Sequence, residues 1–139
     1  MSSFTSLVFG LRAMAKLLAN FISRGFNTVE KIVYRYAPPE DNNDTEAYVN
    51  AVAKASRINR HMVLIPDANT ISKLVRAMVN HENYAQEHHL IDNMDIEQAI
   101  QMLELERKAT TLTIGLVSVL FALAGMLVGA FIEPKKVER

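Results

Sequence analysis

Apolar residues recur every three or four positions through roughly the first 80 residues, which predicts a series of amphipathic helices. The boundaries between these helices are marked by three residues. Gly25 suits the left-handed conformation that ends a helix, Pro38 breaks a helix, and Asp44 is a typical N-terminal cap. We expect Asn27 to cap the second helix. The expected helices cover residues 2–23, 27–37, 45–56 and 69–84, and residues 57–66 and 85–94 are expected to connect them.

The last predicted helix begins at Asp95 and contains no breaking residue before Ile132. Its first half has a narrow apolar stripe formed by Ile96, Ile100 and Leu103. A helix rises about 1.5 Å per residue, so we expect one continuous helix of roughly 55 Å. The fold class is therefore all-α, with about four helices in a head domain and one long C-terminal helix.

Residues 109–132 form an apolar stretch without a charged side chain. About 20 apolar helical residues cross a hydrocarbon core, so this stretch is long enough to be a transmembrane helix. The alternative is a buried core helix, but a chain of 139 residues is too short to surround so long an apolar helix. The sequence favours the membrane span.

Small residues are spaced three and four apart along this span, which places them on one helix face. They are Gly115, Ser118, Ala122, Gly125 and Gly129. Small side chains let membrane helices approach closely, and the last two glycines form a GxxxG pair. We interpret this face, the small-residue seam, as a surface for a second copy or for another membrane protein. The alternative is chance, because such residues are common in membrane helices.

Basic residues flank the span on both sides. Arg107 and Lys108 precede it, whereas Lys135, Lys136 and Arg139 follow it. We expect these five to contact lipid headgroups. The C-terminal excess is a single charge, which leaves the membrane orientation open. The basic tail is also the one place where we expect nucleic acid to be able to bind.

The charges balance overall, with 15 Lys and Arg against 15 Asp and Glu, but they occur in blocks. Residues 1–39 are basic, whereas residues 85–106 contain six acidic residues and no Lys or Arg. This segregation favours electrostatic contacts with a layered partner, and solvated helix faces are the alternative. The absence of cysteine excludes disulfides, cysteine zinc sites and a thiol nucleophile.

Catalytic chemistry has one candidate residue. Glu82, near a helix end, could serve as the acid in glycoside hydrolysis, which generally needs two facing carboxyl groups. Its partner would have to come from the acidic loop at residues 40–46. His81, His88 and His89 lack the spacing of a His-Glu-x-x-His site. We therefore expect no metal and no cofactor, and Glu82 as a solvated carboxylate.

Several segments in one order resemble a family of small phage and prophage proteins, described as virion structural proteins. These segments are Phe9-Gly-Leu-Arg-Ala-Met-Ala-Lys-Leu-Leu18, Arg24-Gly-Phe-Asn-Thr-Val-Glu-Lys-Ile32, Tyr34-Arg-Tyr-Ala-Pro-Pro-Glu40, Tyr48-Val-Asn-Ala-Val-Ala53, Lys73-Leu-Val-Arg-Ala-Met-Val79 and His81-Glu82-Asn83. The resemblance covers residues 4–84, more than half of the chain.

The departures from that family change what the resemblance implies. Members usually begin with an Asn-Asn-Pro-Gly-Asn-Ile-Arg-like segment and a tryptophan-containing stretch, an opening similar to muralytic, lysozyme-like proteins. This sequence starts after that opening, contains no tryptophan, and adds a transmembrane helix. The resemblance therefore implies a virion protein of lysozyme-like ancestry that is shortened at its N-terminus, and the departures argue against enzymatic activity.

Together these features predict a structural membrane protein of a lipid-containing icosahedral, corticovirus-like phage. The expected parts are a helical head at residues 1–84, an acidic linker and stalk at 85–108, the transmembrane helix at 109–132 and a basic tail at 133–139. The expected partners are the bilayer, other transmembrane helices and the capsid protein. We expect the protein in the inner membrane of the host cell before assembly and in the internal membrane of the virion after it. The alternative is a membrane-anchored, peptidoglycan-cleaving enzyme that uses Glu82.

Overall fold

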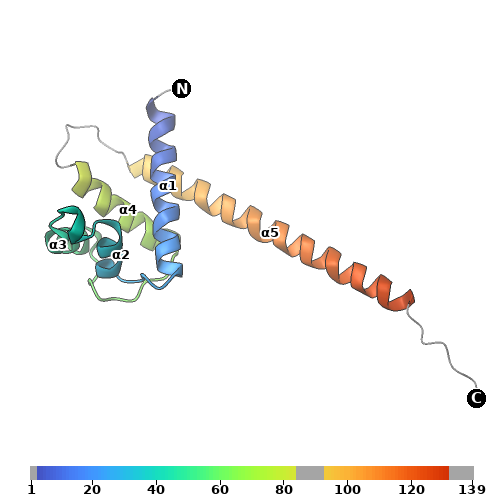
Figure 1. The fold of residues 1–139 in the computed structure, drawn as a ribbon. Helices are drawn as coiled ribbons and strands as arrows, with labels where there is room; N and C mark the ends of the chain where they lie inside the picture. The colour runs from blue at the N-terminus through green and yellow to red at the C-terminus, as the bar shows by residue number, and fades with distance from the viewer. Residues whose placement is uncertain (1–2, 84–92, 132–139) are drawn as a thin grey trace, which may run out of the picture. The chain divides into compact units, whose positions relative to one another are not determined.

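The computed structural model describes the backbone of residues 3–83 and 93–131, and the side chains of residues 7–82 and 93–126 (Figure 1). Helices are the only regular secondary structure among these residues, so the all-α expectation is confirmed. The elements are α1 (Ser3–Ser23), α2 (Val29–Tyr36), the short 3-10 helix η1 (Pro39–Asp41), α3 (Thr45–Ser56), α4 (Ala68–Asn83) and α5 (Asn93–Phe131). The expected loop at residues 85–94 lies almost wholly outside the described residues.

The chain divides into two compact units, Met1–Glu104 and Leu105–Arg139. In the first unit, α4 packs against both α1 and α3, and α2 packs against the same two helices. Helical spacing in the sequence predicts one apolar stripe on α4, formed by Ile71, Leu74, Val75, Met78 and Val79. This stripe is confirmed, because all five side chains are buried in the core. Full burial of such a side chain is worth about 1.5–3 kcal/mol.

Helical spacing in the sequence predicts an apolar face of α1 formed by Leu7, Leu11, Met14, Leu18 and Ile22. The face that enters the core is displaced slightly from this one. The buried residues are Val8, Leu11, Ala15, Leu18 and Ile22, which keep the expected alternation of three and four. Leu7 and Met14 are half-buried and pack against the edge of this cluster. A small side chain, Ala15, occupies a closely packed central position of α1.

The beginning of α5 also belongs to the core of the first unit. Ile96, Ala99, Ile100 and Leu103 are buried in the same apolar cluster as the side chains of α1 and α4. Sequence reasoning assigns these residues to an acidic linker and stalk. The structure gives them a packing role, with the apolar stripe inward and Glu97 exposed on another face of the helix.

The helix ends follow from local chemistry, with three differences from expectation. The last helix, α5, begins at Asn93 and not at Asp95, which lies in its first turn. Thr28, not Asn27, caps α2, because its hydroxyl oxygen accepts the Lys31 N–H at 3.2 Å, whereas the Asn27 carbonyl accepts the Leu64 N–H. Asp67 caps α4 by accepting the Thr70 N–H at 2.9 Å, so this helix begins before Asn69.

The remaining ends are as predicted. Asp44 caps α3, and its carboxylate accepts the Ala47 N–H at 3.1 Å. Gly25 has a φ of 92°, a left-handed conformation that lets the chain turn sharply after α1. Pro38 and Pro39 follow the end of α2.

Candidate functional site

The second unit contains the apolar part of α5, and the described side chains of this part, from Ala109 to Met126, are all exposed. Nine large apolar side chains between Leu112 and Met126 are exposed, with Phe121 at 75% and Met126 at 72%. Each such side chain that stays in water loses the favourable free energy of burial, about 1.5–3 kcal/mol. A stretch of 18 residues in α5 has a mean hydropathy of 1.9, and none of its residues is buried inside the protein. Among the described helices, α5 is the one candidate membrane span.

The hydroxyl groups of this apolar segment all have backbone acceptors. Thr110, Thr111, Thr113 and Ser118 each donate to the carbonyl four residues earlier, at 2.9–3.0 Å. In hydrocarbon a polar group without a partner costs several kcal/mol, so internal satisfaction is a requirement for a spanning helix. The segment between Ala109 and Met126 meets this requirement at every hydroxyl.

The small-residue seam lies on the exposed surface of this helix. Gly115, Ser118, Ala122 and Gly125 are exposed, and a Cβ atom built on Gly115 or Gly125 meets nothing within 4 Å. Gly129 lies within the described backbone of α5. The interior of the protein therefore gives no reason for glycine at positions 115 and 125. The interpretation of the seam as a helix-packing surface stays a prediction.

The predicted headgroup contacts are described only in part. Arg107 and Lys108 are exposed on α5, immediately before the apolar segment. Lys135, Lys136 and Arg139 lie outside the described residues, so their role also stays a prediction. A basic pair at the start of a span is the usual position for side chains that reach the headgroup level.

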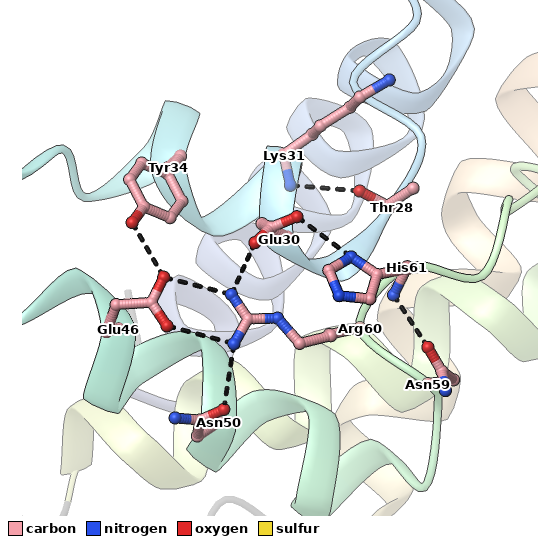
Figure 2. A network of polar contacts seen from close by, with 9 residues as sticks. All are labelled: Thr28, Glu30, Lys31, Tyr34, Glu46, Asn50, Asn59, Arg60 and His61. Carbon is pink, nitrogen blue, oxygen red and sulfur yellow. Dashed lines mark hydrogen bonds and ion pairs between the residues drawn. The ribbon is translucent and has the colours of Figure 1, made fainter.

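A polar network centred on Arg60 joins α2, α3 and the connection that follows α3 (Figure 2). Arg60 donates two hydrogen bonds to the Glu46 carboxylate, at 3.0 and 3.1 Å, and one to Glu30 on α2. It also donates to the side-chain oxygen of Asn50 at 3.3 Å. A bidentate Arg–carboxylate pair fixes direction as well as distance. The network therefore holds the connection against both helices.

The same contacts displace the pKa values of their members. Hydrogen bonds from Arg60, and then from Tyr34, hold the pKa of Glu46 below its ordinary value. The bond to Glu46 raises the pKa of the Tyr34 hydroxyl, which donates to that carboxylate at 2.8 Å. Glu46 is therefore an ionised partner of Arg60, which is the opposite of what a general acid requires.

Glu82, the candidate acid, lies at the end of α4 beside two aromatic rings. Its carboxylate accepts the Tyr48 hydroxyl at 2.7 Å, and the ring of Tyr48 stacks on His81 with centroids 4.0 Å apart. Burial, and then the bond to Glu82, raises the pKa of Tyr48. Tyr36 meets the Tyr48 ring edge-on at 6.3 Å. This arrangement is a packing contact that fixes the end of α4 on α3.

The candidate histidines are only partly described, because His88 and His89 lie outside the described residues. Within residues 3–83 and 93–131, no group of three or more His, Cys, Asp and Glu residues could hold a metal ion.

Sequence reasoning missed Arg60 as the centre of a network. Its partners Glu46 and Glu30 lie 14 and 30 positions away, so no local spacing signals the contact. The available signal was an arginine in the connection between two helices, which is too common to be decisive.

The fold and α5 together define an all-α protein with one candidate membrane span. The chain is 37% identical over 81 residues to Protein P5 of Pseudoalteromonas phage PM2. This similarity covers 58% of the chain and 49% of the relative, so the chain spans about half of the relative's length. No family model and no solved structure matches the chain. The similarity supports a phage protein, and the lysozyme-like ancestry stays a prediction.

Proposed function

We propose that the protein is a structural integral membrane protein of a phage virion. In this proposal α5 crosses the internal membrane, and the first unit links that membrane to the capsid shell. The observation that carries the proposal is the exposed apolar segment of α5, which has no charge and leaves no hydroxyl without an acceptor. Similarity to a phage protein supports the virion as its setting.

The proposed role is adhesive and needs no catalytic residue. The seam packs against the helix of another copy or of a second membrane protein, and the charged surface of the first unit contacts capsid protein. Each contact is weak by itself. Repetition of the same contacts over a symmetric shell gives high avidity, because each bound copy raises the effective concentration of the next.

The membrane part of the proposal is tested by extraction at alkaline pH. Full-length protein in host membranes should stay in the pelleted fraction, whereas the double variant Leu116→Lys, Leu120→Lys should be released. A lysine at the centre of a span costs about 2.5–3.5 kcal/mol on the insertion scale. Leu105→Lys is the matched control, because Leu105 is also exposed on α5 but precedes the uncharged segment. Release of the unaltered protein would refute the membrane span.

The virion part is tested on purified particles by mass spectrometry and chemical cross-linking. We expect the protein in particles, in the detergent-released lipid fraction, with cross-links from lysines of the first unit to capsid protein. Lys54 and Lys73 are suitable, since both are exposed on α3 and α4. Absence from purified particles would refute a virion role and favour a factor that acts in the host membrane.

A further inference from the structure

The connection between α3 and α4 is irregular but closely held. The Leu64 N–H donates to the Asn27 carbonyl at 2.8 Å, and the Glu30 N–H donates to the Arg60 carbonyl at 3.2 Å. The side chain of Leu64 is buried in the core, and Arg60 binds α2 and α3 as described above. The backbone of residues 58–65 is therefore fixed at several points rather than left to solvent.

This fixed segment exposes three large apolar side chains within four positions. Met62 is 56% exposed, Val63 68% and Ile65 66%, whereas Leu64 between them is 4% exposed. Single exposed apolar residues are normal on protein surfaces, but a contiguous group on an ordered segment usually marks an interaction site. The core gains nothing from these three side chains, so packing within the first unit does not account for them.

Exposed cations lie on or next to the segment and the neighbouring connection. The hydrogen bond between Leu64 and Asn27 places the connection after α1 beside it, and both connections lie at the same end of the first unit in Figure 1. Arg24, Lys31 and Arg57, on or next to these two connections, are all exposed. The surface thus combines exposed aliphatic side chains with nearby basic side chains, a combination that suits the headgroup region of an anionic bilayer.

We propose that this surface, which we call the apolar connection (residues 62–65), inserts into the lipid–water interface of a membrane. The proposal rests on the proposed function, because a chain held by α5 meets the bilayer at high effective concentration. Met62, Val63 and Ile65 enter the boundary between headgroups and acyl chains, and the neighbouring cations contact phosphate. The first unit then holds the membrane surface at a second point.

The absence of cysteine makes the test direct, because a single introduced thiol can be labelled. Val63→Cys carries an environment-sensitive fluorophore in full-length protein reconstituted into vesicles of phosphatidylcholine and phosphatidylglycerol. Nitroxide-labelled phosphatidylcholine serves as the quencher. Asn80→Cys is the matched control, because Asn80 is exposed on α4, about 18 Å along that helix from its start. Leu120→Cys reports on the span itself.

We expect strong quenching at position 120, about a twofold loss of emission at position 63, since interfacial segments enter roughly 5–10 Å, and little change at position 80. Adding Met62→Glu and Ile65→Glu to the Val63→Cys protein should abolish quenching at position 63. Both side chains are more than half exposed, so these changes leave the core intact. The same two changes in the Leu120→Cys protein should leave quenching at position 120 unchanged, which checks that the protein is still inserted in the vesicles.

Three other outcomes would overturn the inference. Quenching at position 120 without quenching at position 63 refutes it and leaves the proposed span standing. Quenching at neither position refutes both. A change of emission at position 63 that depends on protein-to-lipid ratio, without lipid quenching, identifies a second copy of the chain as the occupant and also refutes insertion.

Discussion

Ile96 tests whether the beginning of α5 belongs to the core of the first unit. The side chain is 2% exposed and lies in the apolar core cluster of the first unit. Ile96→Ala removes three buried carbons, each worth about 0.8 kcal/mol, and leaves a cavity. We expect a total loss of about 2–5 kcal/mol in the free energy of unfolding of the first unit.

The four tyrosines all precede residue 85, so the tyrosine bands of the near-UV circular dichroism spectrum report on the first unit and not on the apolar segment of α5. Thermal unfolding of the full chain in detergent micelles is the assay. For a domain of this size each kcal/mol lowers Tm by about 4–8 °C, so the variant should unfold at least about 8 °C lower. Leu105→Ala, on the same helix at a position 66% exposed, is the control.

For Leu105→Ala we expect a change within about 0.5 kcal/mol, as for most exposed positions. Equal melting temperatures for the two variants would show that the first turns of α5 do not pack in the core. The reasoning would also fail if the unaltered protein showed no cooperative transition in the tyrosine signal.

Three further predictions concern the seam, the network and the candidate acid. Gly125→Ile should reduce energy transfer between labelled copies in vesicles several-fold, because a Cβ there meets nothing within the chain and acts only on a partner. The pKa of Glu46 is lowered in the folded protein, so its bond to Arg60 contributes stability above the ordinary pKa of 4.5, and this stability is lost as the pH falls through the folded value. In melting curves measured over a series of pH values, Glu46→Gln should therefore reduce the fall of Tm at acid pH (the acid limb). Glu82→Gln should leave cell-wall sacculi as undegraded as the unaltered protein does, and Tyr48→Phe should cost about 1 kcal/mol from the lost hydrogen bond.

Each of the three has a result that would contradict it, and the seam prediction also has a control variant. Leu123→Ile, a change on the same helix outside the seam, should leave energy transfer unchanged, and equal loss in both variants would contradict a specific seam. An acid limb identical in Glu46→Gln and the unaltered protein would contradict the assignment of that limb to Glu46. Clearing of sacculi by the unaltered protein that is lost in Glu82→Gln would restore the enzyme alternative.

Local patterns were sufficient for the helices. The stripe of α4, the cap at Asp44 and the turn at Gly25 depend on residues within a few positions of one another, so the sequence alone predicts them. The apolar segment of α5 is equally local, because length and absence of charge define a candidate span without reference to its neighbours. The choice of Asn27 over Thr28 as a cap failed because both residue types suit that position and a distant contact decided between them.

The sequence by itself thus determined the helical class, the order of the helices and the candidate span. Only the tertiary structure placed Ile96 and Leu103 in the core, since a narrow stripe on an acidic segment also suits a solvated stalk. It likewise joined Arg60 to Glu30 and Glu46, and exposed Val63 while burying Leu64 next to it. These features depend on which helices meet, and contacts between residues far apart in the chain leave no periodicity to read.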